Sequence, residues 1–182
     1  MRKDIHPDIK KILFSEEDIK NIVEKTAAKI NEDYKDEEIT VVVILRGSMV
    51  FAADLIRCLN MPVTVEFMQA SSYGSSTSST GFINIKRDLD ADIEGKNVLI
   101  IEDIIDSGNT LFRLKNVLED RKPKSCNICT LLDKPERRVT DVEVKYVGAI
   151  IPDEFVVGYG LDYDEHYRNL PYIGVLKEEI YQ

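Results

Sequence analysis

The chain has 182 residues, of which 33 are acidic and 24 are basic, so its formal net charge is −9. A chain of this length suits one compact domain and buries about two thirds of its unfolded surface without help from disulfides. Its excess of acids disfavours binding to nucleic acid or to an anionic membrane surface, because like charges repel.

No segment has the pattern of a membrane helix or of a secretory signal. The longest apolar stretch, residues 39–45, is far shorter than the roughly 20 residues that a membrane helix requires. The first eight residues carry charges and no apolar core. We therefore expect a cytoplasmic protein with no membrane partner.

The first part of the chain alternates between helical and extended patterns. Ser15 precedes three acids and is a good N-cap, and the apolar residues after it recur at helical spacing. Residues 39–45 form a β-branched apolar run that is typical of a strand buried on both faces of a parallel sheet. A turn at 46–48 leads into an expected helix over 49–59, and residues 61–67 alternate like a strand.

Residues 71–81 break this pattern, because they contain almost no apolar side chain and cannot pack into a core. They form either a flexible linker between domains or a long loop within one domain. Strand-like segments flank them closely on both sides, which favours the loop. Long loops often cover sites, so we favour a lid.

The second part continues the alternation, with expected strands at 97–101, 125–132 and 144–151 and a helix that ends near Arg121. Strands and helices in alternation predict an α/β fold, with a central, mainly parallel sheet flanked by helices and connected by right-handed crossovers. Ligands of such sheets bind at the carboxyl ends of the strands. Three segments occupy those positions: 45–48, 102–110 and 133–138.

Two of the three cysteines, Cys126 and Cys129, have the C-x-x-C spacing of some metal and redox sites. Both lie in the expected strand 125–132, where residues three apart face opposite sides. The sequence has no second C-x-x-C to complete a zinc site. We therefore interpret both cysteines as structural.

Residues 98–110, Val-Leu-Ile-Ile-Glu-Asp-Ile-Ile-Asp-Ser-Gly-Asn-Thr, carry the strongest functional signal. Glu102 and Asp103 end a buried strand, where two carboxylates are costly unless a cation or a hydroxyl meets them. The glycine at 108 lets a ligand approach the backbone, hydroxyls on both sides can donate, and the N-terminus of the following helix favours an anion. Acids for the hydroxyls of a sugar therefore lie beside a nest for its phosphate, which predicts a ribose 5-phosphate site.

Each half of this motif has an ordinary alternative. Asp-Ser-Gly can be a simple turn and N-cap, and an acid pair also ends a strand in response-regulator receiver domains, where it binds magnesium. The whole motif at this spacing is much rarer. It resembles the phosphoribosyl pyrophosphate motif of the type I phosphoribosyltransferases.

The resemblance extends over nearly the whole chain and is closest to the hypoxanthine (hypoxanthine-guanine) phosphoribosyltransferases of bacterial type. Further segments match in the family's order: the pyrophosphate loop at 45–47, the start of the mobile catalytic loop at 71–74, the purine-reading segment at 131–135, and the C-terminal hood at 152–163 and 167–170. The resemblance implies the type I fold, in a single domain over 1–182 with a mobile active-site loop and a small hood from the N-terminal segment and roughly 152–182.

The implied activity is purine salvage: transfer of the 5-phosphoribosyl group from phosphoribosyl pyrophosphate to hypoxanthine, and to guanine, which gives IMP or GMP and pyrophosphate. The implied cofactor is Mg²⁺, and the implied assembly is a homodimer or homotetramer. The resemblance implies the following roles: Asp106 as the acid/base at purine N7; Ser107, Gly108, Asn109 and Thr110 for the 5-phosphate; Glu102 and Asp103 for the ribose hydroxyls, directly or through Mg²⁺; Arg46, Gly47 and Arg168 for pyrophosphate; Ser72 and Tyr73 for the mobile loop; Lys134, Phe155 and Val156 for the purine; and Asp162 for a second Mg²⁺ beside the purine.

Several alternatives stay open. Without the resemblance, Phe155 suits a core and Lys134 suits a solvated loop, and the metal-binding acid within 162–165 is undefined. Some relatives have lysine in place of Arg46 or Asn109, which bears on the strength of phosphate and pyrophosphate binding but not on the reaction. Pyrimidine-operon regulators carry a similar motif and bind RNA, but they need a basic face. A xanthine-preferring or pyrimidine-using transferase is the remaining rival, and the hood sequence 155–162 favours hypoxanthine and guanine.

Overall fold

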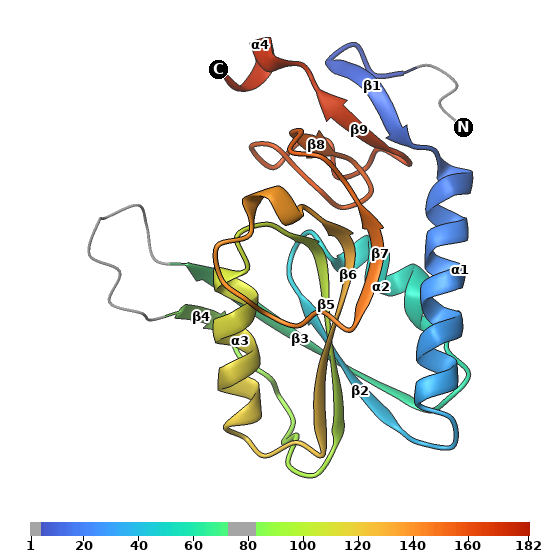
Figure 1. Cartoon of the computed structure of the whole chain (residues 1–182), viewed down its shortest axis with the longest axis vertical. Coiled ribbons are helices and arrows are strands. Elements are labelled where there is room, and N and C mark those ends of the chain that lie inside the picture. Colours follow the sequence, from blue (N-terminus) through green and yellow to red (C-terminus); the bar gives the residue numbers. More distant parts are fainter. Residues whose placement is uncertain (1–4, 73–82) are drawn as a thin grey trace.

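The structure of the protein is a computed structural model that describes residues 5–72 and 83–182 (Figure 1). Its main sheet has six strands in the order β4-β3-β2-β5-β6-β7, and all of its neighbours are parallel except the pair β3–β4. The predicted α/β class with a central, mainly parallel sheet is therefore confirmed. The strands are β2 (Ile39–Ile44), β3 (Val63–Ser72), β4 (Ile83–Arg87), β5 (Asn97–Ile105), β6 (Ser125–Asp133) and β7 (Tyr146–Ile150).

Helices cover both faces of this sheet. Helices α1 (Glu16–Asp33) and α2 (Met49–Ile56) pack on one face, and α3 (Asn109–Glu119) packs on the other (Figure 1). The N-cap of α1 is Ser15 as predicted, because its hydroxyl accepts from the backbone of Asp18 while its own backbone N–H donates to the Asp18 carboxylate. This reciprocal cap fixes the start of the helix.

The core is explained by the strand patterns. All six residues of β2 are buried, with Val41 and Val43 facing the α1 and α2 side and Val42 and Ile44 facing the α3 side. A strand sandwiched between two helical layers needs apolar residues at almost every position, and Thr40 is the one polar residue of β2. The C-x-x-C pair obeys the same alternation, since buried Cys129 joins the first core and Cys126 packs against the second. The interpretation of opposite faces is confirmed.

A second sheet of three strands, in the order β1-β9-β8, lies beyond the carboxyl ends of the main sheet (Figure 1). We call this sheet and residues 158–172 the hood. Strand β1 (Ile9–Phe14) pairs antiparallel with β9 (Ile173–Leu176), and β9 pairs with β8 (Val156–Val157). The sequence patterns do not predict β1 or β9, because only one residue of β1 is buried and β9 is only four residues long and buried throughout. Helix α4 (Glu178–Tyr181) follows β9.

Several boundaries differ from the sequence predictions. Strand β5 continues to Ile105, because Ile104 and Ile105 pair with the end of β6, so the acid pair lies within the strand rather than after it. Helix α2 ends at Ile56 instead of residue 59, and β3 begins at Val63, just after Pro62. Strands β3 and β4 pair up to Ser72 and Ile83. The segment that joins them therefore connects neighbours within one sheet, which argues against a linker between domains.

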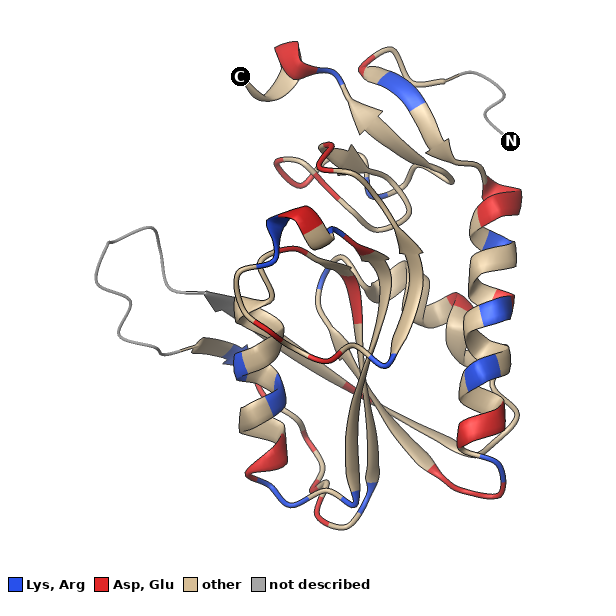
Figure 2. Ribbon diagram, in the orientation of Figure 1, with Lys and Arg blue, Asp and Glu red and all other residues tan. Residues whose placement is uncertain are grey.

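Charged residues are scarce in the strands of the main sheet and gather at its two ends and on the helices (Figure 2). This distribution leaves the sheet apolar and places charged side chains at the ends of its strands. Within the described part of the chain, no helix is long and apolar enough to cross a membrane.

Candidate active site

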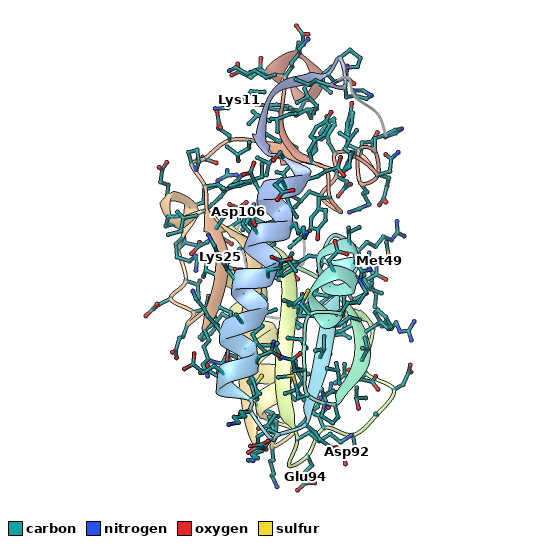
Figure 3. All side chains as sticks on the ribbon, turned by 90° about the vertical axis from the view of Figure 1, so that its right-hand side faces the viewer. Lys11, Lys25, Met49, Asp92, Glu94 and Asp106 are labelled. Atoms are coloured by element: carbon teal, nitrogen blue, oxygen red, sulfur yellow. The ribbon has the colours of Figure 1, made fainter. Side chains whose placement is uncertain are left out.

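The segments that follow strands β2, β5, β6 and β7 meet at the carboxyl end of the main sheet. In the register, Ile105 lies beside Asp133, and Asp133 lies beside Ile150, so β5, β6 and β7 end at the same level. The hood covers this end of the sheet. Asp106 lies at the end that faces the hood, whereas Asp92 and Glu94 lie at the opposite end (Figure 3). The sequence-predicted sites at the carboxyl ends therefore come together below the hood.

The acid pair on β5 lies against the loop that follows β2. A Cβ atom on Gly47 would overlap the Asp103 carboxylate, so only glycine lets this loop lie on the acid. The other oxygen of Asp103 accepts from the backbone N–H of Ile104 at 2.7 Å. The peptide bond between Leu45 and Arg46 is cis. The predicted pyrophosphate loop and the predicted ribose acids thus form one unit.

Burial leaves both acids short of compensating charge. It raises the pKa of Glu102 well above its usual range, and the charge of Asp103 raises it further. Burial also raises the pKa of Asp103 to about 6, despite opposing backbone hydrogen bonds and the positive charge of Arg168. One carboxylate oxygen of Glu102 is buried without a hydrogen-bond partner. A cation or a ribose hydroxyl would relieve this desolvation.

A turn and a helix N-terminus follow the acids. Gly108 has φ +83°, and a Cβ atom there would lie 2.7 Å from the carbonyl oxygen of Thr140, so this position requires glycine. Helix α3 begins at Asn109 after Gly108, which has no capping side chain, and the Ser107 hydroxyl accepts from the Asn109 N–H only at 3.4 Å. The loop is held in place because the Ser107 carbonyl accepts from the backbones of Val139 and Thr140, each at 3.0 Å. Uncapped N–H groups at a helix start suit a phosphate.

Two cavities adjoin at Asp106 and Ile104. The first, of about 310 Å³, is lined by Glu102, Ser107, Gly108 and Thr110, which are predicted to bind ribose and phosphate, and by the predicted acid/base Asp106, among others. The second, of about 220 Å³, is lined by Asp103, Ile104, Asp106, Lys134, Arg137, Phe155, Val156, Leu161 and Asp162. We call them the phosphate cavity and the base pocket. Every residue predicted to bind the purine lines the base pocket, although these residues come from three separate stretches of chain.

The side chains of the base pocket combine a flat apolar surface with charge. Phe155 is 36% exposed, stacks on Tyr181 with ring centroids 4.8 Å apart, and meets Tyr163 edge-on at 5.6 Å. Lys134 is only 5% exposed, and its backbone N–H donates to Ile105 at 3.0 Å. A buried cation beside an aromatic ring suits a planar base with an acceptor on its edge.

Two arginines lie at the hood side of the site and are paired with acids. Arg168 contacts Asp162 at 2.9 Å and donates to the Gly160 carbonyl at 2.8 Å, and Arg46 contacts Glu165 at 2.7 Å. Of the three acids in 162–165, Asp162 is the one that lines the base pocket. Gly160 also lies against the pyrophosphate loop, because a Cβ atom there would overlap the carbonyl oxygen of Gly47.

The residues predicted to bind magnesium do not form a complete protein cage. In 5–72 and 83–182, no group of three or more His, Cys, Asp or Glu side chains is arranged to hold a metal ion. Mg²⁺ normally takes only one or two carboxylates and fills its other positions with water and substrate phosphates. The unpartnered oxygen of Glu102 and the desolvated Asp103 are donors of this kind, so they fit the ion.

Three residues at or beside the site were not predicted, and part of the predicted site lies outside the described residues. The sequence analysis did not identify Arg137, Asp153 or Tyr181, although a second cation three residues after Lys134 was a signal for the first of these. The predicted loop residue Tyr73, the side chain of Ser72 and most of the proposed lid 71–81 lie outside the described residues.

Comparisons with known proteins agree with this geometry. The family model of the phosphoribosyl transferase domain matches residues 11–164. A hypoxanthine-guanine phosphoribosyltransferase of Staphylococcus epidermidis is 56% identical over 177 residues, which cover 97% of this chain and 99% of that protein. A crystal structure of a hypoxanthine phosphoribosyltransferase from Staphylococcus aureus is 51% identical with a TM-score of 0.95, covering 100% of this chain and 99% of that one. A ternary substrates complex of hypoxanthine phosphoribosyltransferase from Trypanosoma cruzi is 42% identical with a TM-score of 0.93, covering 97% of this chain and 100% of that one.

Proposed function

The chain belongs to the phosphoribosyltransferase family, and on that premise we propose that it is an enzyme of purine salvage, a hypoxanthine-guanine phosphoribosyltransferase. It transfers the 5-phosphoribosyl group of phosphoribosyl pyrophosphate to hypoxanthine, and to guanine, giving IMP or GMP and pyrophosphate. The observation that carries this proposal is the position of Asp106, which lines both the phosphate cavity and the base pocket. A sugar phosphate in one and a purine in the other would meet beside this carboxylate.

In the reaction, a ring nitrogen of the purine displaces pyrophosphate from C1 of the ribose. The sugar gains positive charge in the transition state and the leaving group gains negative charge. Glu102 and Asp103 lie on the strand that ends at the phosphate cavity, where they would bind the ribose hydroxyls and face the developing cation. Preorganised charge of this kind is the usual source of a large part of enzymatic rate enhancement.

Asp106 is the proposed acid/base. One of its oxygens is buried without a hydrogen-bond partner, so it has a free acceptor position in the site. We propose that this carboxylate exchanges the proton at purine N7 while the base attacks C1. General acid/base catalysis contributes about 10² to 10⁴ in rate.

The leaving pyrophosphate needs positive partners. Arg168, Arg46 and the backbone of Gly47 are the proposed ones, and both arginines would exchange their acidic partners for pyrophosphate oxygens. The proposed cofactor Mg²⁺ would be held by Glu102 and Asp103, with a second ion at Asp162, and would shield the charge of pyrophosphate as it leaves. Support for this comes from the unpartnered carboxylate oxygen of Glu102 and from the closeness of Asp162 to Asp103, whose pKa it raises.

Base choice is proposed to depend on Lys134, which has donors and no acceptor. It complements O6 of hypoxanthine or guanine and meets the amino group of adenine donor to donor. Phe155 would stack on the ring and the backbone of Val156 would bind the base edge, since both line the same pocket. We therefore expect adenine to be a very poor substrate.

The test is a panel of bases, namely hypoxanthine, guanine, xanthine, adenine and uracil, each supplied with phosphoribosyl pyrophosphate and magnesium. Nucleotide formation is followed chromatographically. We expect rapid formation of IMP and GMP and little product with the other bases. Formation of UMP, or no nucleotide with any base, would contradict the proposed function.

A cytoplasmic location is a further proposal, and a second, a homodimeric or homotetrameric assembly, rests on the family resemblance. Analytical ultracentrifugation of the purified protein at micromolar concentration tests the second. A single species with the mass of one 20.8 kDa chain would contradict it.

A further inference from the structure

Two charged residues outside the predicted site, Asp153 and Arg137, lie between Lys134 and Asp106 of the base pocket. The Oδ1 atom of Asp153 lies 3.8 Å from Nζ of Lys134 and 3.6 Å from Nε of Arg137. The Nη1 atom of Arg137 in turn lies 3.6 Å from Oδ2 of Asp106. Four side chains of alternating sign, Lys134, Asp153, Arg137 and Asp106, therefore form one continuous row.

The backbone holds both ends of this row. Lys134 precedes a single 3₁₀ turn, Pro135–Arg137, and its carbonyl accepts from the N–H of Arg137 at 3.2 Å. The N–H of Lys134 donates to Ile105, the residue before Asp106. Asp153 follows the end of β7, which is the parallel neighbour of β6. The four side chains thus come from the ends of three adjacent strands.

Burial makes the acid important to the lysine. Lys134 is 5% exposed, and a buried ammonium group is costly without a nearby opposite charge. Asp153 is the one acid found within ion-pair distance of its Nζ in the described parts of the chain. The contacts of Arg137 are about half-exposed, so water screens them and they contribute little to stability. Their effect is to restrict where the charged groups can lie.

We propose that Asp153 is a positioning residue for base recognition that acts through Lys134, and that Arg137 restrains the carboxylate of Asp106. The inference rests on the proposed function. Lys134, Arg137 and Asp106 line the base pocket but Asp153 does not, so its influence on the base must pass through another side chain.

The shape of the purine explains why the two ends of the row would be coupled. O6 and N7 lie next to each other on one edge of the base. Lys134 is proposed to donate to O6 and Asp106 to bind the proton at N7, so both groups read the same edge. Asp153 and Arg137 lie between these two groups and set their separation before the base arrives. Preorganisation of this kind improves recognition because less side-chain freedom is lost on binding.

The test begins with Asp153→Asn, which keeps the shape and removes the charge. We expect KM for hypoxanthine to rise about tenfold, as contacting charged groups typically couple. KM for phosphoribosyl pyrophosphate should change by less than about twofold, and the preference for hypoxanthine over adenine should shrink. Asp153→Glu keeps the charge and should retain most of the affinity for hypoxanthine.

The matched control is Glu136→Gln, which removes an acid from the same turn. Glu136 is exposed, lies between Lys134 and Arg137 in the chain, and has no ion pair among the described contacts. Its kinetic constants should stay within about twofold of the parent, as for ordinary surface substitutions. An equal rise in KM for hypoxanthine in both variants would reduce the effect to net charge and overturn the proposal.

Double-mutant cycles separate positioning from a general structural role. In a Lys134→Ala background, Asp153→Asn should have no further effect on KM for hypoxanthine. In an Asp106→Asn background, Arg137→Gln should likewise cause no further loss of turnover, although it lowers turnover in the parent. Additive effects in either cycle would refute the corresponding contact.

The parent enzyme separates this inference from the proposed function. If the parent forms no IMP, the proposed function fails and the kinetic cycles lose their meaning. If the parent is active and Asp153→Asn leaves KM for hypoxanthine unchanged, only the inference fails. Melting temperatures check that each variant is folded, and Asp153→Ser replaces Asp153→Asn in the same cycle if the latter is unstable.

Discussion

Asp106 lines two cavities with different chemistry, so its substitution should separate binding from catalysis. Asp106→Asn preserves the shape of the side chain but removes the base that would take the N7 proton. Turnover should fall by about 10² or more, while phosphoribosyl pyrophosphate still binds. Steady-state kinetics and calorimetric titration measure the two quantities. Near-normal turnover would show that Asp106 is only a turn residue.

The buried acid pair at the ligand site reduces the stability of the free protein. The pKa of Asp103 is raised to about 6 in the folded chain, from an ordinary value of 3.8, so the folded state binds its proton more tightly than the unfolded state does. The free energy of unfolding of the ligand-free protein should therefore fall as pH rises from about 4 to about 6, and this loss remains at neutral pH.

Asp103→Asn removes that charge and tests the argument. At neutral pH, without magnesium or substrate, the variant should melt a few degrees higher than the parent, since one kcal/mol shifts the melting temperature of a protein of this size by about 2–4 °C. It should also bind phosphoribosyl pyrophosphate more weakly. A lower melting temperature at neutral pH, and an unchanged difference at pH 4, would contradict the desolvation argument.

At the scale of elements, the short helix α4 supports the base pocket from outside it. Tyr181 on this helix stacks on Phe155 at an interplanar angle of 21° and does not line the pocket itself. It therefore supports the ring that is proposed to stack on the purine. Aromatic pairs of this kind contribute about 0.5–1.5 kcal/mol beyond the area they bury.

We expect Tyr181→Ala to raise KM for hypoxanthine by about three- to tenfold, because Phe155 loses the ring that holds it, and to leave KM for phosphoribosyl pyrophosphate nearly unchanged. Tyr181→Phe keeps the ring and serves as the matched control, so it should behave like the parent. Equal losses for both substrates in Tyr181→Ala would indicate general unfolding of the hood instead.

The elements that the sequence predicts well are those whose pattern is set by the main sheet. Apolar runs such as 39–44 are buried on both faces, so composition alone indicates them. The sequence patterns do not indicate the hood strands. Only one residue of β1 is buried, and β1 pairs with a strand more than 150 residues away, which leaves no local pattern. The nest at 107–110 could be predicted because Gly108 and its neighbours are consecutive in the sequence. The roles of Asp153 and Arg137 could not be predicted, because their contact exists only after β6 and β7 are placed side by side.

At the scale of the whole molecule, an acidic protein has to bind a strongly anionic substrate. The chain carries a net charge of −9, and two of its carboxylates lie at the very site proposed for phosphoribosyl pyrophosphate. Arg46, Arg168 and the N-terminus of α3 supply local positive potential, but both arginines are already paired with acids. A divalent cation would offset the remaining negative charge.

Activity should therefore disappear in excess chelator and return when Mg²⁺ is added beyond the chelator. The rate of IMP formation measures this, and sodium chloride at equal ionic strength controls for nonspecific salt effects. Full turnover in excess chelator would refute the role of the metal in the proposed mechanism.

The pairing of β1 with β9 has a consequence for the synthesis of the protein. Residues 9–14 are synthesised more than 150 residues before their pairing partner, residues 173–176. The main sheet and the phosphate nest consist entirely of residues made in between, so they can assemble while translation continues. The hood sheet must wait for β9. A nascent chain can thus acquire the part of the site that holds the sugar phosphate before the hood completes the base pocket with Phe155 and Val156.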